Sequence, residues 1–421
     1  MKVLIITYYW PPAGGSGVQR WLKFVKYLQE FGIEPVVYTV ENANYLKQDT
    51  SLLTEVPKGI AILKQPIWEP TALLFWKKSK QQTKGISNVS KGGFLSFIRG
   101  NFFIPDPKVF WVKPSVSYLQ KYLDANDIDV IISTGPPHSV HLIAERLHQK
   151  NDIKWLADFR DPWSDLYYNK DFKQLAFAKN KNRKLEESVL KNADCIVTVS
   201  NSLKQEFAKK AKKVEVITNG FDDEFVAADN IILDTKFSIS YIGLLPKQSN
   251  PKLLFKVLKA LCEESLNFKK DLQLNFIGDI SEEVKVAIEE NKLLKNTNFV
   301  GYVSHQKAIE YQNTSQVLLL LIPNVKNNKG ILTGKLFEYL KAKRPILAIG
   351  PEKGDLATML QETNSGVIVN FDAEEKLKLE IEALYQKYKE DKLTVNFNDI
   401  EKYHRKELTK KLAFILKSLN S

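Results

Sequence analysis

The sequence predicts an α/β protein built from two Rossmann-like, doubly wound domains. The chain has 421 residues, too many for one hydrophobic core and suited to two domains of about 200 residues each. Short apolar runs alternate with amphipathic helical patterns along most of the chain, which is typical of parallel strands joined by helices. A turn signal at Asn219-Gly-Phe-Asp222, followed by an acidic stretch, divides the chain near its middle.

The apolar runs and helical patterns give the expected elements in order. In the first half we expect strands at 3–8, 36–39, 60–64, 130–134, 155–158, 195–199 and 214–218. Helices are expected at about 18–31 and 174–192, and another begins after residues 135–138 with Ser139 as its N-cap. In the second half we expect strands at 237–243, 272–278, 297–301, 317–321 and 345–349, and helices at about 251–266, 333–340, 373–388 and 400–419. We therefore expect domains at 1–222 and 236–392, a linker at 223–235 and a C-terminal segment at 393–421.

The charge and the two cysteines limit the classes of partner and compartment. A formal charge of +12 predicts an anionic partner, either nucleic acid, anionic lipid or a phosphorylated substrate. The lysines are spread along the chain without a zinc-finger, RRM or helix-turn-helix signature, so we expect no nucleic acid partner. Cys195 and Cys262 are expected to be buried thiols in a reducing compartment. With neither a signal peptide nor a membrane-spanning run, the sequence predicts a cytoplasmic protein that touches a bilayer only from its inner surface.

Residues 66–114 interrupt the α/β pattern. This segment combines aromatic residues, among them Trp68, Phe102 and Phe110, with lysines and Arg99. Such a composition suits an interfacial segment that places rings at headgroup depth and cations on anionic lipid phosphates. It equally suits a loop-rich subdomain that packs its aromatic residues inward. Both interpretations stay open from the sequence.

The stretch 330–350 reads as loop, helix and strand directly after an apolar strand. A helix that begins near Thr333 carries Lys335 in its first turn, where the helix dipole favours an anion rather than a cation. A phosphate would supply that anion, and Gly334 lets the backbone approach it closely. Glu338 lies three residues after Lys335 on the same face, where it could accept hydrogen bonds from a ribose diol. The alternative is a solvated ion pair between Lys335 and Glu338.

Gly334-Lys-Leu-Phe-Glu-Tyr-Leu, together with Lys343-Arg-Pro-Ile-Leu-Ala, resembles the donor-binding segment of the family 4 glycosyltransferases. These are retaining enzymes of the GT-B fold, with two Rossmann-like domains facing a central cleft and a last helix that crosses back to the first domain. The resemblance implies that Glu338 binds the ribose of a nucleotide sugar. The first glutamate of the family's motif falls on Gly330, so this sequence departs from the pattern at the contact to the donor sugar.

The resemblance extends to the first half of the chain. The loop after the first strand is similar to the family's glycine-rich loop, which places Gly15 and Gly17 against the donor diphosphate. His138, at the end of a strand, matches the position of a histidine beside the donor sugar.

Asp-Phe-Arg-Asp-Pro-Trp163 resembles the segment that lines the acceptor side of the cleft in bacterial members of the family. Asp158, Arg160 and Asp161 crowd together directly after a strand, which is costly unless they pair or meet a polar ligand. We expect one carboxylate to pair with Arg160 and the other to meet an acceptor hydroxyl.

In the second half, the resemblance implies contacts from three further places. Gly243 ends a strand, and Lys247 is the cation of the loop that follows it, where family members neutralise the donor diphosphate. Tyr302 and Val303, after another strand, are expected to contact the nucleobase.

These residues predict a retaining glycosyltransferase that moves a sugar from a UDP- or GDP-sugar to a hydroxyl of a glycan or lipid-linked acceptor, in cell-surface polysaccharide or glycolipid assembly. Lys247 and Lys335 would stabilise the departing diphosphate, and His138 and Asp161 would orient donor and acceptor. No Asp-x-Asp or histidine cluster predicts a metal or another cofactor. Two alternatives remain: a nucleotide-sugar 2-epimerase on the same fold, and a non-catalytic protein that binds a membrane surface.

Overall fold

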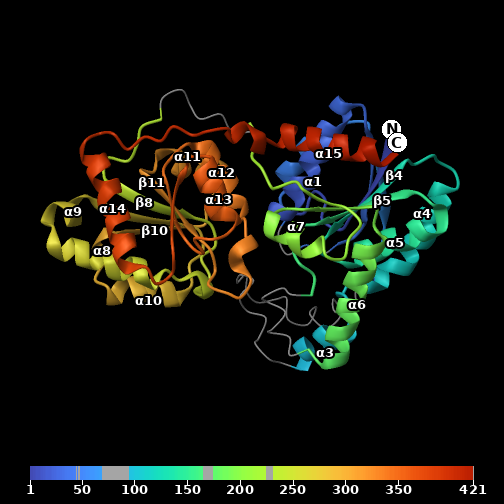
Figure 1. Ribbon diagram of the computed structural model, residues 1–421, viewed down its shortest axis with the longest axis horizontal. Helices are drawn as coiled ribbons and strands as arrows, with labels where there is room; N and C mark the ends of the chain where they lie inside the picture. The colour runs from blue at the N-terminus through green and yellow to red at the C-terminus, as the bar shows by residue number, and fades with distance from the viewer. Residues whose placement is uncertain (44, 46–47, 69–93, 165–173, 224–230, 421) are drawn as a thin grey trace. The chain divides into compact units, whose positions relative to one another are not determined.

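The computed structural model describes residues 1–43, 45, 48–68, 94–164, 174–223 and 231–420 (Figure 1). These residues form two compact units, one of Met1–Asn219 with Arg405–Ser421 and the other of Gly220–His404. Each unit is built around one parallel β-sheet, of seven strands in the first unit and six in the second. The predicted class of two Rossmann-like α/β domains is confirmed.

The sheet of the first unit has the strand order β3-β2-β1-β4-β5-β6-β7. Its strands are β1 (Lys2–Thr7), β2 (Glu34–Val40), β3 (Ala61–Gln65), β4 (Val130–Gly135), β5 (Lys154–Phe159), β6 (Cys195–Thr198) and β7 (Val214–Val216). Most positions of the central strands are buried because helices cover both faces, which explains their continuous apolar runs. The direction of winding changes between β1 and β4, and open α/β sheets bind their ligands at such a switch point.

The helices of the first unit are α1 (Ser16–Leu28), α3 (Phe94–Phe102), α4 (Val112–Leu123), α5 (Ser139–Asn151), α6 (Ala176–Asn192), α7 (Asn201–Phe207) and α15 (Arg405–Asn420). Alternate residues of β1 enter separate hydrophobic cores. Val3 and Ile5 pack with residues of α1 and α15, and Leu4 and Ile6 pack with residues of α4 and α5. The last helix of the chain therefore completes the core of the first unit, where it lies beside α1 (Figure 1).

The second unit repeats the pattern with the strand order β10-β9-β8-β11-β12-β13. Its strands are β8 (Phe237–Ile242), β9 (Leu272–Ile277), β10 (Thr297–Gly301), β11 (Val317–Leu321), β12 (Ile346–Ile349) and β13 (Gly366–Val369). Its helices are α8 (Lys252–Glu264), α9 (Leu266–Asp271), α10 (Glu282–Glu290), α11 (His305–Thr314), α12 (Gly334–Ala342), α13 (Asp355–Glu362) and α14 (Glu374–Lys389). The switch point of this sheet lies between β8 and β11.

The N-terminus of α5 differs from the prediction. Ser139 is the first helical residue and not the N-cap, which is His138. The buried carboxylate of Asp106 takes the capping role from a distant segment, because it accepts hydrogen bonds from the Ser139 N–H at 2.9 Å and from the Ser139 hydroxyl at 2.8 Å. A side chain remote in sequence thus supplies the acceptor that a helix start needs.

The segment 66–114 packs some of its aromatic residues inward and exposes others. Residues 69–93 lie outside the described part of the chain. Trp111 is fully buried and stacks on Tyr38 at a ring distance of 5.1 Å, whereas Phe102 and Trp68 are mostly exposed. Cys195 and Cys262 are buried free thiols, as predicted. Within the described residues, every helix is too short or too polar to cross a bilayer.

Candidate active site

The predicted site residues gather at the carboxyl ends of the strands beside each switch point, in both units. In the second unit, Gly243 and Lys247 follow β8, and the α12 residues follow β11. In the first unit, the glycine-rich loop follows β1, His138 follows β4, and residues 158–161 end β5 and continue beyond it.

Lys335 lies in the first turn of α12, as predicted, and is half-buried. Its ammonium donates a hydrogen bond to the Tyr241 hydroxyl at 2.5 Å and lies 3.9 Å from the centre of that ring. Gly243 makes room for this arrangement: its φ is 114°, and a Cβ there would lie 2.6 Å from Cε of Lys335. Burial lowers the pKa of Lys335 to about 8, an effect that Glu338 partly offsets. The amine is thus held at the switch point, and no carboxylate of the described residues lies at ion-pair distance from it.

Glu338 does not form the ion pair with Lys335 that the sequence left open. Its Oε2 instead accepts a hydrogen bond from Nε2 of the buried Gln312, on α11, at 2.8 Å. The amide fixes the half-buried carboxylate and leaves the other oxygen for a ligand. The ion-pair alternative is therefore wrong, because each partner is held by a different neighbour.

The N-terminus of α12 is free of side-chain capping. Thr333 occupies the N-cap position, but its side chain makes no capping hydrogen bond. Its Oγ1 is buried and has no hydrogen-bond partner among the described residues. Gly334, the first helical residue, is exposed. Unsatisfied donors at a helix start attract an anion, and a phosphate oxygen fits the chemistry of this group.

The remaining predicted residues of the second unit are less buried than Lys335, apart from Val303. The side chain of Lys247 is 44% exposed, and its Nζ lies 4.0 Å from Oε1 of Glu283. Tyr302 follows β10 and is 82% exposed, which leaves its ring open to a stacking partner. Val303 packs partly into the core beside α12, and Gly330 ends a short 3-10 helix before that helix.

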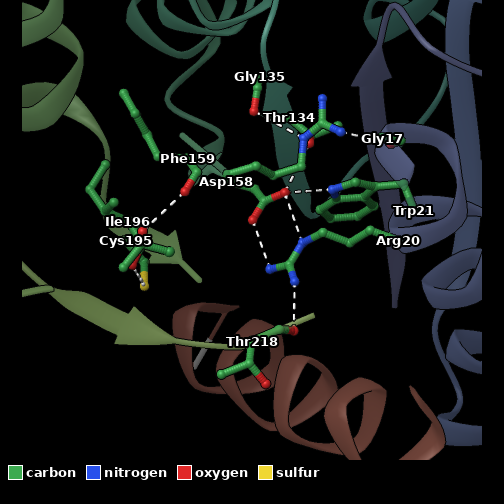
Figure 2. Close-up of polar contacts among 12 residues, drawn as sticks. Gly17, Arg20, Trp21, Thr134, Gly135, Asp158, Phe159, Cys195, Ile196 and Thr218 are labelled. Carbon is green, nitrogen blue, oxygen red and sulfur yellow. Dashed lines mark hydrogen bonds and ion pairs between the residues drawn. The ribbon is translucent and has the colours of Figure 1, made fainter. Parts of the chain in front are cut away.

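In the first unit, Asp158 is fully buried, and Figure 2 shows its side chain pointing toward Arg20 and Trp21. Its carboxylate forms an ion pair with Arg20 at 3.0 Å and accepts hydrogen bonds from Nε1 of Trp21 at 2.6 Å and from the Thr134 hydroxyl at 2.9 Å. Arg20 in turn donates to the Thr218 carbonyl. Asp158 therefore joins α1, β4 and the segment after β7 and presents no oxygen to solvent.

Arg160 forms an ion pair with neither Asp158 nor Asp161, so the predicted pairing is corrected. Its guanidinium donates to the carbonyls of Gly17, Gly135 and Pro136 at 2.6–3.0 Å. A Cβ on Gly17 would lie 2.7 Å from Nη1 of Arg160, so a larger residue there would require the guanidinium to shift. Arg160 ties Gly17, at the start of α1, to the turn after β4, and this positions both segments at the switch point.

Asp161 is half-buried and has no hydrogen-bond partner among the residues that the structure describes. Burial raises the pKa of its carboxyl group above the ordinary value, and Arg160 partly offsets the effect. Of the two aspartates, Asp161 is the one that keeps part of its surface exposed.

His138 lies at the end of β4, as predicted, and is 5% exposed. Its ring stacks on Trp163 at 4.6 Å, and neither ring nitrogen has a protein partner among the described residues. Burial, reinforced by His141 and Arg160, holds its pKa well below the ordinary value, so the ring is neutral at physiological pH. A neutral imidazole offers one donor and one acceptor, which suits a sugar hydroxyl.

The sequence reasoning missed Arg20 and Trp21, which hold Asp158. Both lie in an amphipathic helix and carry no local motif. The one signal was the arginine itself. Arg20 lies on the apolar face of that helix, among the buried residues Val18, Trp21 and Leu22. A buried arginine requires a buried acid, but the sequence does not say which one.

Among the described residues, Asp222, Asp223 and His404 form one group with the spacing of metal ligands. His404 Nε2 lies 3.7 Å from Asp222 and is within hydrogen-bond distance of Asp223, at 3.1 Å. The expectation of a reaction without a metal stays a prediction.

Two family models match the sequence. Residues 91–225 match Glycosyltransferase Family 4, and residues 222–399 match Glycosyl transferases group 1. None of the curated proteins matches.

Solved structures of similar fold cover nearly the whole chain. Sucrose-phosphate synthase from Thermosynechococcus elongatus is 13% identical with a TM-score of 0.60, covering 99% of this chain and 98% of its own. HepE from Anabaena, solved in complex with UDP-glucose, is 11% identical with a TM-score of 0.58, covering 100% and 97%. A UDP-N-acetylglucosamine 2-epimerase described as putative, from Listeria monocytogenes, is 11% identical with a TM-score of 0.57, covering 99% and 96%. At these identities the similarity to solved structures establishes the fold, and the reaction class is inferred from the family models.

Proposed function

Because the chain is a glycosyltransferase of the GT-B fold, we propose that it transfers a sugar from a nucleoside diphosphate sugar to a hydroxyl group of a glycan or lipid-linked acceptor, with retention of configuration. Similar structures hold UDP-glucose or UDP, which supports a UDP-sugar before a GDP-sugar as donor. Assembly of a cell-surface polysaccharide or glycolipid is the context that we expect, with the protein cytoplasmic and peripheral on the inner membrane face.

The observation that carries this proposal is the pairing of Lys335 with the uncapped start of α12. The amine, the free helix N–H groups and the unpartnered Thr333 hydroxyl offer positive potential and donors at one place. Negative charge builds on the diphosphate as it leaves, so donors already in place lower the barrier. In this proposal Glu338 accepts hydrogen bonds from the ribose, Lys247 adds charge, and Tyr302 with Val303 meets the base.

The first unit supplies the remaining roles. We assign His138 to a hydroxyl of the donor sugar, because its ring nitrogens are unpartnered and the ring is held by Trp163. Asp161 takes the acceptor hydroxyl. Asp158 and Arg160 are positioning residues that hold the start of α1, which follows the loop with Gly15, and the end of β4 in place.

The affinity for a nucleoside diphosphate is expected to fall as the pH rises above about 8. The pKa of Lys335 in the free protein is about 8, and only the protonated amine attracts phosphate. A bound diphosphate favours the charged amine and raises its pKa, so binding above pH 8 takes up a proton and weakens by up to about tenfold per pH unit.

Titration calorimetry with UDP between about pH 6.5 and 9.5 measures this dependence. Lys335→Arg is the matched control, because a guanidinium stays charged throughout that range and should flatten the profile. A wild-type affinity that does not change across the range would contradict the role assigned to the Lys335 amine.

A thermal-shift screen across nucleoside diphosphates tests the proposal directly. A ligand that binds only the native state stabilises it by about 2.7 kcal/mol at a hundred times its Kd, so the matching nucleotide should raise the Tm. Uridine and guanosine diphosphates are compared at equal concentration, with the corresponding nucleosides as controls that lack the diphosphate. No shift with any diphosphate would refute a nucleotide-sugar donor.

Incubation of the donor sugar nucleotide without an acceptor separates transfer from epimerisation, since similar structures include 2-epimerases. A transferase leaves the sugar configuration unchanged and releases at most free sugar by hydrolysis. An epimerase yields the 2-epimer, which NMR of the anomeric proton distinguishes.

A further inference from the structure

The start of α6 is fixed against the end of α3. The Gln174 side-chain amide donates to the Gly100 carbonyl at 3.0 Å, and the Leu175 N–H donates to Oδ1 of the buried Asn101 at 2.6 Å. The rings of Phe102 and Phe177 lie 6.2 Å apart across this junction. Figure 1 shows α3 at the N-terminal end of the long α6. The two helices therefore form one surface from segments far apart in the sequence.

Apolar side chains at this junction are turned to solvent. Phe102 is 66% exposed, Phe177 50% and Leu175 44%. A single exposed ring is ordinary, but neighbouring exposed rings from two helices mark an interaction surface.

The face of α6 that carries Phe177 is basic. Lys181 and Lys184 follow Phe177 by four and seven residues, so all three lie on one side of the helix. Both lysines are exposed, and neither forms an ion pair within the described residues. Residues 174–185 contain four cations, the others being Lys179 and Arg183, and no acid. The first turns of α6, which carry the exposed Phe177, are therefore basic, and the first acids of the helix are Glu186 and Glu187.

We propose that the α3–α6 patch, made of Phe102, Leu175, Phe177, Lys181 and Lys184, docks the protein onto an anionic lipid bilayer. Aromatic rings lie well at headgroup depth, and nearby lysines gain energy from anionic lipid phosphates. The sequence suggested membrane contact only for residues 66–114. The structure adds the N-terminal part of α6 to this contact surface, and the cations of the patch, Lys181 and Lys184, lie on α6. This docking rests on the proposed function, because a lipid-linked acceptor is reached from a membrane surface.

A second basic surface offers the matched control. A groove of about 530 Å³ between α4 and α5 is lined by Lys113, Lys121, Arg146 and Lys150. This groove is open to solvent and is positively charged like the patch, but no exposed aromatic ring lines it. If net positive charge alone attracted lipid, substitutions in this groove would act like substitutions in the patch.

Sedimentation of the full chain with vesicles tests the docking. The vesicles contain phosphatidylcholine alone or with about one third phosphatidylglycerol, because the anionic surface supplies the attraction. Wild-type protein should sediment with the anionic vesicles and only weakly with the neutral ones. Lys181→Gln with Lys184→Gln should weaken binding to anionic vesicles by about tenfold or more, since each cation near the surface contributes roughly fivefold. Phe102→Ser with Phe177→Ser should weaken it by about tenfold.

The control Lys121→Gln with Lys150→Gln should bind like the wild type. The proposal would be overturned if the groove variant lost as much binding as the patch variants. It would also be overturned if the wild type bound neutral and anionic vesicles equally, or bound neither. Free inorganic phosphate, added as a competitor, separates recognition of a single phosphate group from docking on a lipid surface. If millimolar phosphate abolished sedimentation with the vesicles, the docking proposal would be overturned.

The thermal shift with a nucleoside diphosphate is measured on every variant. Patch variants that keep this shift and the wild-type Tm show that the unit is folded and that the donor site is intact. If the protein does not bind vesicles but keeps the thermal shift, the docking proposal fails and the proposed sugar transfer stands. If no nucleoside diphosphate shifts the Tm, the proposed donor fails whatever the vesicle result is.

Discussion

Lys335→Ala is expected to lower kcat/KM for the nucleotide-sugar donor by about 10²–10³-fold, the effect typical of removing one preorganised group that stabilises developing negative charge. The Lys335 amine lies at the uncapped start of α12, where the proposed diphosphate also meets backbone donors and Thr333. Its removal takes away the cation nearest to the developing charge and leaves the more exposed Lys247 and the helix N–H groups to offset it. Steady-state kinetics with the donor found in the thermal-shift screen give the value.

The fold should tolerate this change, because Lys335 is half-buried and its one hydrogen bond goes to Tyr241. Lys335→Arg should retain part of the activity through its permanent charge. Lys295→Ala, at an exposed lysine of the same unit, serves as the control and should match the wild type. Activity of the Lys335→Ala variant within a few fold of the wild type would remove the amine from the mechanism.

Asp158→Ala is expected to destabilise the first unit by about 3–5 kcal/mol, the usual result of deleting one member of a buried ion pair. The substitution leaves the Arg20 guanidinium, which is 2% exposed, without its counter-ion. It also leaves the indole N–H of Trp21 and the hydroxyl of Thr134 without their acceptor. Urea unfolding followed by tryptophan fluorescence measures the loss as a lower midpoint.

Asp161→Ala is the matched control, since it removes the same group three residues away. Asp161 is half-buried and has no hydrogen-bond partner among the described residues, so its loss should change the free energy of unfolding little while lowering transfer. The pair Asp158→Leu and Arg20→Leu should recover part of the stability that either single change loses. Similar unfolding midpoints for the Asp158 and Asp161 variants would show that the buried network does not hold this unit together.

The strand ends and the α12 motif could be predicted from the sequence because their signals are local. Continuous apolar runs mark strands buried on both faces, and Gly334, Lys335 and Glu338 lie within five residues. Helix geometry alone puts the lysine in the first turn and the glutamate on its face. Those two placements are found in the structure as expected.

The partners of the site residues could not be predicted in this way. Asp158 stands next to Arg160 in sequence but pairs with Arg20, 138 residues away, because β5 and α1 meet at the switch point. Lys335 meets Tyr241 across 94 residues, and Asp106 caps a helix 33 residues further along. Parallel strand order brings these groups together, and no local spacing encodes that order.

By itself, the sequence determined the two doubly wound sheets, the helix that presents Lys335 and Glu338, and the family resemblance, because periodicity and short motifs act over a few residues. Only the tertiary structure decided which of the two aspartates is accessible, which partners hold Lys335 and Glu338, and that α6 contributes its lysines to the exposed rings of α3. Those outcomes depend on which strand ends and helix ends meet. Burial and the competition among nearby donors and acceptors then decide which hydrogen-bond or ion-pair partner each site residue has.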